Sequence, residues 1–284
     1  MSNLKTFIRI SFGFILFYAA LLSLRKKPLS SRLKWPKQKW ILGHRGARAN
    51  APENTLSAFK KAMEYGADGV EFDVFLSSDG VPVVIHDETV DRTTDGHGAV
   101  EDLPAGQLAQ LNAAKDYSGF AKEGVPTLLQ VLESMPAGAI INVELKASGH
   151  FSRQVFVEKL MSIFKQHEQR LTLIISSFDG ELLYYFRSMA PDYLISLLLS
   201  PVEENWPKAI AYMDAIGPDA LHLPAQLAGP LVLKLARRAH IHVAIWTVNN
   251  TDEAKLWFKK GIAGIFTDMV PEMIAALPKN LLQS

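Results

Sequence analysis

Short runs of β-forming residues alternate with amphipathic helical stretches along the chain from residue 40. One such stretch is "NTLSAFKKAMEYG", in which Leu56, Phe59 and Met63 recur at helical spacing and Gly66 provides a stop. Eight alternations of this kind are typical of the (β/α)₈ TIM barrel, an α/β fold with a ring of parallel strands inside a ring of helices. We therefore expect this fold. The predicted strands cover residues 40–43, 69–76, 139–146, 171–177, 193–198, 220–223, 242–248 and 264–267.

The length and composition suit one barrel. A (β/α)₈ barrel takes roughly 250 residues as one domain. A chain of 284 residues, of which 48% are hydrophobic, supplies enough apolar surface for its core. The chain has no cysteine, which excludes a disulfide framework, a thiolate zinc site and a cysteine nucleophile. We expect residues 40–284 to form one barrel domain.

One region interrupts the alternation after the second strand. The segment "SSDGVPVVIH" predicts a hairpin with its turn at Asp79-Gly80 and a returning strand at residues 81–86. The next helix is not expected before Thr127-Leu128. We therefore predict a small insertion at about residues 87–125 on one face of the barrel, where loops commonly carry function.

The first 39 residues differ from the rest. Residues 10–24, "ISFGFILFYAALLSL", carry no charge, and with Phe7 and Ile8 they approach the roughly 20 residues that a membrane-spanning helix needs. We predict that residues 1–39 form one N-terminal hydrophobic helix, acting as a membrane anchor, and a basic linker. A cleaved signal peptide and an interfacial helix are the alternatives. Two basic residues precede the apolar segment and seven follow it, which predicts that the barrel lies on the cytoplasmic side of the membrane.

The net charge of +1 hides an asymmetry. Residues 1–39 hold nine basic and no acidic side chains, so the remaining 21 basic and 29 acidic residues give the rest of the chain a net charge of −8. A nucleic-acid-binding domain usually has a basic face. We therefore expect no nucleic acid partner, whereas the basic linker suits an anionic membrane surface.

Acidic side chains occupy the inward positions of two predicted strands. In "GVEFDVFL" the alternation of a strand sends the apolar residues one way and Glu71 and Asp73 the other, into the barrel. In "IINVELKA" the same alternation turns Glu144 and Lys146 inward. Buried unpaired charges are costly, so we predict one divalent cation held by Glu71, Asp73 and Glu144. Oxygen ligands favour magnesium (Mg²⁺) or calcium (Ca²⁺); a metal-free network of acids and lysine is the alternative.

Two histidines follow apolar runs at comparable strand ends. His44 comes after "WILG" and His86 after "VPVVI". Histidine transfers protons near neutral pH, so a pair beside a metal is a natural acid and base. Arg45 and Lys146 lie at the same end and suit a phosphate oxygen. The alternative role for Arg45 is a salt bridge to Glu53 that orients the loop. Arg45 could form this salt bridge and bind phosphate at the same time.

Seven short motifs in this order resemble those of the glycerophosphodiester phosphodiesterase family. They extend over residues 40–275, and together they are far more specific than any one alone. The resemblance implies a barrel with a small insertion after the second strand, and a divalent cation on the three predicted acids. The motifs are "HRG" at 44–46, "PENT" at 52–55, "EFD" at 71–73, "HD" at 86–87, "ELK" at 144–146, "WTVN" at 246–249 and "TD" at 267–268.

The resemblance also implies an activity, the hydrolysis of glycerophosphodiesters to glycerol 3-phosphate and an alcohol. His44 and His86 would be the catalytic acid/base pair, and which is the acid stays open. Arg45 and Lys146 would bind the phosphate, and Trp246 would form an apolar wall for the glycerol or the leaving group. The nucleophile is water or a hydroxyl of the substrate's own glycerol.

The segment "PENT" is expected to turn the chain into the first helix, with Asn54 as its N-cap. We also expect Glu53 and Asn54 to brace the residues around the cation. Among the other histidines, His222, near the end of the sixth predicted strand, is the one kept as a reserve candidate.

Other functions remain open at this point. A lysophospholipase D that acts on membrane lysophospholipids would give the predicted anchor a purpose. A phosphoinositide- or sphingomyelin-cleaving lipase fits the motifs less well. A catalytically inactive, membrane-tethered binding barrel is less consistent with a full set of histidines and acids.

Overall fold

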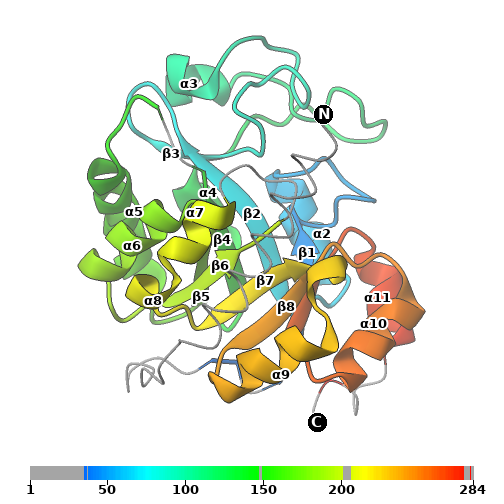
Figure 1. The fold of residues 1–284 in the computed structure, drawn as a ribbon. Helices are drawn as coiled ribbons and strands as arrows, with labels where there is room; N and C mark the ends of the chain where they lie inside the picture. Colours follow the sequence, from blue (N-terminus) through cyan, green and yellow to red (C-terminus); the bar gives the residue numbers. More distant parts are fainter. Residues whose placement is uncertain (1–34, 37, 147–148, 201–205, 278–281, 283–284) are drawn as a thin grey trace, which may run out of the picture.

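A closed ring of parallel strands with helices on its outside makes up the body of the protein (Figure 1). The computed structural model describes residues 35–36, 38–146, 149–200, 206–277 and 282. Within them, eight parallel strands form the ring: β1 (Trp40–His44), β2 (Gly69–Leu76), β4 (Ile140–Leu145), β5 (Thr172–Ser177), β6 (Leu194–Leu198), β7 (Ala220–Pro224), β8 (His242–Trp246) and β9 (Gly264–Thr267). Neighbours follow the chain order, and β1 pairs with both β2 and β9, which closes the ring. The predicted (β/α)₈ TIM barrel is therefore confirmed.

Helices follow the strands along the outside of the ring. The helix after the insertion begins where the sequence predicts, because Thr127 and Gln130 form a capping box at its start. The helices are α2 (Leu56–Glu64), α3 (Ala105–Leu108), α4 (Leu128–Ser134), α5 (Arg153–His167), α6 (Gly180–Met189), α7 (Trp206–Ala211), α8 (Met213–Ile216), α9 (Pro230–Arg238), α10 (Thr251–Lys259) and α11 (Val270–Ala276), with 3₁₀ turns η1 (Val100–Asp102) and η2 (Ala225–Leu227).

The start of α2 corrects one prediction. The N-cap is Thr55, whose hydroxyl accepts a hydrogen bond from the N–H of Ala58 at 3.2 Å. Asn54 has a left-handed backbone with φ of 57°, and its side-chain amide donates to Asp73 instead. Since an N-cap residue needs an extended backbone, the left-handed Asn54 is unsuited to the position that the sequence predicts for it.

Strand alternation separates the core into two layers. Apolar residues such as Phe72 point outward and pack under the helices, where Phe59 of α2 lies 5.4 Å away between ring centroids. Burying a side chain of this size contributes about 1.5–3 kcal/mol. Inward-facing residues including Trp40, the first residue of β1, and Phe266 of β9 fill the barrel interior. A Cβ on Gly264 would lie 2.1 Å from the Trp40 ring, so glycine is required there.

The insertion after β2 is present and has a small core of its own. The hairpin strand β3 (Pro82–Val84) pairs antiparallel with the end of β2, and Gly80 takes the positive φ that the turn requires. Apolar residues of β2, β3 and the following loops, among them Phe75, Val90 and Leu108, are buried together. The insertion thus rests on the carboxyl-terminal end of β2, above one side of the barrel (Figure 1).

The predicted N-terminal hydrophobic helix at residues 10–24 lies outside the described residues. Of the predicted anchor and linker, the structure describes only residues 35, 36, 38 and 39. Each helix in the described part of the chain falls short of the length or apolar character needed to cross a bilayer.

Candidate active site

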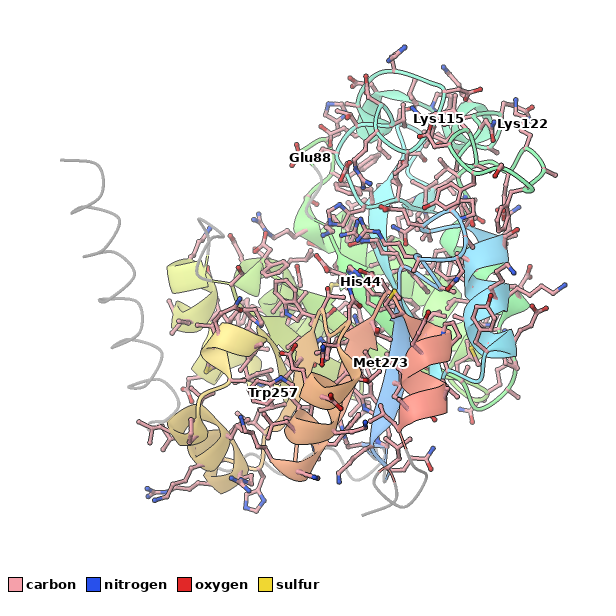
Figure 2. The ribbon with its side chains drawn as sticks, turned by 90° about the vertical axis from the view of Figure 1, so that its right-hand side faces the viewer. His44, Glu88, Lys115, Lys122, Trp257 and Met273 are labelled. Atoms are coloured by element: carbon pink, nitrogen blue, oxygen red, sulfur yellow. The ribbon has the colours of Figure 1, made fainter. Side chains whose placement is uncertain are left out.

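A cavity of about 340 Å³ opens at the carboxyl-terminal ends of the barrel strands. His44 at the end of β1, Glu71 of β2 and Glu144 of β4 line it together with Trp246 of β8. Figure 2 shows His44 at the end of the barrel that carries the insertion, which is marked there by Glu88, Lys115 and Lys122. This is the end at which TIM barrels place their active sites.

Three carboxylates meet beside this cavity, and two of them, Glu71 and Glu144, line it. Glu71, Asp73 and Glu144 are all buried, and each offers one oxygen within 4.8 Å of the other two. Parallel pairing sets Asp73 beside Glu144 and Glu71 beside Asn142 on the neighbouring strand. Because period-two alternation points all of them into the barrel, the inward-facing prediction agrees with this arrangement.

Burial and mutual repulsion control the ionisation of these acids. Burial, together with the charges of Asp73 and Glu144, raises the pKa of Glu71 well above its usual value, although Arg45 acts in the opposite direction. Burial also raises the pKa of Asp73, but Lys146, His86 and Arg45 outweigh it, and the pKa is lowered overall. The surroundings therefore shift the pKa values of these two neighbouring acids in opposite directions.

The donor set fits a divalent cation. Oxygens bound to one cation at 2.0–2.6 Å lie at most about 4–5 Å apart, which the three carboxylates satisfy. The side-chain oxygens of Asn54 and Asn142 are buried beside them without a hydrogen-bond partner among the described residues. The three clustered carboxylates and these two amides offer only oxygen atoms as ligands, as Mg²⁺ and Ca²⁺ prefer.

Positive side chains surround the same acids. Lys146 Nζ lies 3.0 Å from Asp73 Oδ1 and also donates to Glu144 Oε1. Arg45 Nε lies 3.5 Å from Asp73 Oδ2, while the backbone N–H of Arg45 donates to Glu71 Oε2 at 2.9 Å. Arg45 also forms the salt bridge to Glu53 that the sequence suggested, with Nη1 2.9 Å from Oε1. Both cations thus border the cavity, as predicted.

The two histidines are each held by an aspartate. His44 Nδ1 lies 2.8 Å from Asp268 Oδ1, and His44 Nε2 lies 4.0 Å from Glu71 Oε2. His86 Nδ1 lies 2.5 Å from Asp87 Oδ1. A carboxylate only accepts hydrogen bonds, so Nδ1 carries a proton in both rings and Nε2 is left for other partners. Both histidines line the cavity.

The two aspartates were not predicted as site residues. Asp268 follows β9 and accepts a second hydrogen bond, at 2.8 Å, from the side chain of Asn249. Asp268 belongs to the motif "TD" and Asp87 to the motif "HD". The family motifs therefore could have indicated these two residues, whereas the alternation of strand residues could not. The sequence alone does not show that Asp268 meets His44, because the contact depends on ring closure between β1 and β9.

Aromatic side chains form the apolar wall. Trp246 packs edge to face against Phe178, with 5.8 Å between ring centroids, and both line the cavity. Trp246 was predicted here and Phe178 was not.

The reserve candidate His222 lies in the barrel interior, fully buried, with Nε2 2.8 Å from Ser196 Oγ. Burial lowers the pKa of His222 to about 3, so it is neutral at pH 7.

Comparison with known proteins identifies the family. The model of the glycerophosphoryl diester phosphodiesterase family matches residues 44–272. The glycerophosphodiester phosphodiesterase of Caldanaerobacter subterraneus subsp. tengcongensis is 38% identical over 243 residues, which are 84% of this chain and 98% of that protein. Glycerophosphodiester phosphodiesterase 1 of Homo sapiens is 30% identical over 261 residues, covering 81% of this chain and 78% of the human protein.

Solved structures agree with the sequence comparison. A phosphodiesterase of Oleispira antarctica, in complex with the product sn-glycerol-3-phosphate, matches with a TM-score of 0.75 and 28% identity over 84% of this chain and 96% of its own. A glycerophosphodiester phosphodiesterase of Thermotoga maritima matches with a TM-score of 0.67 and 30% identity over 84% and 97% of the two chains. The chain therefore belongs to the glycerophosphoryl diester phosphodiesterase family and is a phosphoric diester hydrolase.

Proposed function

We propose that this enzyme hydrolyses glycerophosphodiesters to glycerol 3-phosphate and an alcohol, with one divalent cation and with His44 and His86 as acid and base. The observation that carries the proposal is that two aspartate-held histidines line one cavity together with Glu71 and Glu144, which cluster with a third carboxylate, Asp73. The relatives named glycerophosphodiester phosphodiesterase, and the related enzyme with bound sn-glycerol-3-phosphate, support the choice of substrate.

Glu71, Asp73 and Glu144 would hold the cation, Mg²⁺ or Ca²⁺. When bound, it would supply Lewis-acid polarisation of a phosphoryl oxygen and balance the charge of the three acids. Lys146 and Arg45 would bind the remaining phosphate oxygens as charge-assisted donors. Their carboxylate partners orient these cations before substrate arrives, so little reorganisation is needed as negative charge builds up on the phosphate.

The histidines would move the protons. One Nε2 accepts the proton of the attacking hydroxyl, from water or from the substrate's own glycerol, and the other donates a proton to the departing oxygen. Asp268 and Asp87 keep the proton on Nδ1, which fixes the tautomer and the ring orientation that this exchange needs. Asn54 holds Asp73 in place through its amide, 3.0 Å from Oδ2.

The aromatic wall favours a second substrate class within the same chemistry. Phe178 and Trp246 would accept the apolar part of a lysophospholipid, which would make the enzyme a lysophospholipase D. The cavity volume of about 340 Å³ is near the lower end of ligand pockets and suits a small head group better than an acyl chain. We therefore rank glycerophosphodiesters first. The complete histidine and acid set argues against an inactive binding barrel.

The membrane assignment also stays a proposal. The uncharged run at residues 10–24 and the basic linker support a single N-terminal anchor with the barrel on the cytoplasmic side. Protease protection of the full chain in sealed vesicles tests this, because a cytoplasmic barrel is cleaved from the cytoplasmic side only.

Incubation of the purified full chain with glycerophosphocholine, and separately with lysophosphatidylcholine, tests the substrate. Mass spectrometry of the products should show glycerol 3-phosphate in the first reaction at the higher kcat/KM. Lysophosphatidic acid formed faster from the second substrate would reverse the ranking. A folded protein that releases neither product would refute the proposed function.

A further inference from the structure

Three arginines converge on the buried carboxylate of Glu53. Arg45 Nη1 lies 2.9 Å from Oε1, Arg48 Nε lies 2.9 Å from Oε2, and Arg92 holds both oxygens, at 2.7 Å through Nη2 and 3.1 Å through Nη1. Burial would raise the pKa of Glu53, but the hydrogen bond from Arg92 and the charges of Arg45 and Arg48 lower it to about 2. Glu53 is therefore an anion throughout the neutral pH range.

Arg92 continues from Glu53 to one of the histidines. Its Nε lies 2.5 Å from Asp87 Oδ2, and its Nη2 donates to Asp87 Oδ1 at 3.2 Å. Asp87 Oδ1 is also the atom that contacts His86 Nδ1, at 2.5 Å. Arg92 thus bridges two carboxylates with a planar guanidinium, which constrains the direction of the contact as well as its length.

Arg48 continues from Glu53 to the other histidine. Its Nη1 lies 3.8 Å from Asp268 Oδ1, the oxygen that lies 2.8 Å from His44 Nδ1. The contacts therefore form one continuous chain in which carboxylates and arginines alternate between the two histidines. It runs His44, Asp268, Arg48, Glu53, Arg92, Asp87, His86.

We propose that Glu53, with Arg48 and Arg92, is a positioning group that couples the two histidine–aspartate pairs and fixes their separation across the substrate. The inference rests on the proposed function of both histidines. His44 and Asp268 belong to barrel strands and their ends, whereas His86, Asp87 and Arg92 belong to the chain that leaves β3 for the insertion. Glu53 is the residue at which contacts from both parts meet.

The coupling has a chemical purpose. One histidine removes a proton and the other delivers one at the opposite side of the phosphorus, so the distance between the rings has to match the substrate. Misplacement of a catalytic group by about 1 Å can cost about 10²-fold in rate. Arg92 and Arg48 are partly exposed, at 46% and 34%, whereas their partner Glu53 is buried. When one of these arginines is removed, Arg45 and the other arginine still pair with Glu53, so the loss should reduce turnover more than folding.

Steady-state kinetics of the full chain with glycerophosphocholine test the inference. Arg92→Ala should lower kcat about tenfold or more with KM changed by less than about twofold and the melting temperature by less than about 3 °C. Arg92→Lys should restore part of kcat. In the double variant Arg48→Ala/Arg92→Ala the losses should be non-additive, because both act through Glu53.

Arg187→Lys is the matched control. Arg187 pairs with buried Asp219 at 2.8 Å and bonds several carbonyls at the amino-terminal end of the barrel strands. This control should lower the melting temperature and leave kcat unchanged. If Arg92→Ala behaves in the same way, with turnover intact and only stability reduced, Arg92 is merely structural and the inference is overturned.

A spectroscopic readout separates this inference from the proposed function. In ¹⁵N–¹H spectra of the histidine side chains, Glu53→Gln should shift the ring signals of both His44 and His86, and Arg187→Lys should shift neither. These spectra need no turnover, so they decide the coupling even if the wild-type chain releases no product. Unchanged ring signals in Glu53→Gln would overturn the inference while leaving catalysis by the two histidines intact.

Discussion

His44 Nδ1 and Asp268 Oδ1 lie 2.8 Å apart although 224 positions separate the two residues in the sequence. The pair forms where the first and last strands of the barrel meet, since β1 pairs with β9 through Gly43 and Thr267. Closure of the ring therefore completes the candidate site as well as the fold.

Replacement of Asp268 should damage catalysis without unfolding the protein. An amide in Asp268→Asn can donate to His44 Nδ1 and favour the tautomer with its proton on Nε2, which cannot accept a proton there. We predict that kcat for glycerophosphocholine falls by about 10²-fold or more with KM little changed. A circular dichroism melt checks folding. Wild-type turnover in this variant would show that Asp268 does not orient the base or acid.

The carboxylate cluster predicts opposite effects of one substitution with and without metal. Glu71 is buried beside Asp73 and Glu144, which raise its pKa. In Glu71→Gln the metal-free protein should therefore gain stability, by about 1 kcal/mol, because a costly buried group is neutralised. The same variant should bind Mg²⁺ or Ca²⁺ more weakly, so adding either metal should raise its stability less than that of the wild type. Urea unfolding with EDTA and with each metal measures both effects; equal metal stabilisation in variant and wild type would exclude Glu71 as a ligand.

The two histidines should differ in their dependence on the leaving group. A p-nitrophenyl leaving group departs without protonation, so the histidine that serves as general acid is not needed for it. We predict that either His44→Asn or His86→Asn recovers most of its lost kcat on a p-nitrophenyl diester, and that the other does not. Equal losses of both variants on both substrates would contradict an acid/base pair.

Burial of His222 predicts a pH dependence of stability. Its pKa falls from 6.5 to about 3 because the ring is buried, and its neighbours are the hydroxyl of Ser196 and the rings of Trp40 and Phe266. The unfolded chain binds a proton below about pH 6.5 and the folded chain does not until about pH 3, so stability is lost as pH falls through this window.

The size of this effect is about 1.4 kcal/mol per pH unit below pH 6. Urea unfolding between pH 6 and 4 should show a slope that is shallower by this amount in His222→Gln. Ser196→Ala, which keeps the imidazole, serves as the control and should retain the wild-type slope. Identical slopes in wild type and His222→Gln would mean that the buried ring is protonated in the folded state.

Sequence periodicity predicts the parts of this protein that depend on local geometry. The alternation in "GVEFDVFL" is a property of one strand, so it places Glu71 and Asp73 correctly without knowledge of the neighbours. The helix start at Thr127 is equally local, because the capping box lies within four residues. The Asn54 cap was wrong because the backbone of Asn54 is left-handed and its side chain turns to Asp73, a residue of β2.

Long-range contacts in the site required the structure. Arg92 lies in an irregular loop, where neither strand nor helix periodicity indicates the direction of a side chain. Its contacts with Asp87 and Glu53 depend on how the insertion folds onto the barrel. Phe178 likewise meets Trp246 only because β5 and β8 belong to the same ring.

Metal-dependent release of glycerol 3-phosphate from glycerophosphocholine by the full chain tests the central claim most directly. We predict release by the wild type, its loss in EDTA, and its return with Mg²⁺ or Ca²⁺, while Glu71→Ala stays inactive with either metal. Undiminished release by Glu71→Ala, or by the wild type freed of divalent cations, would contradict an active site built on this carboxylate cluster.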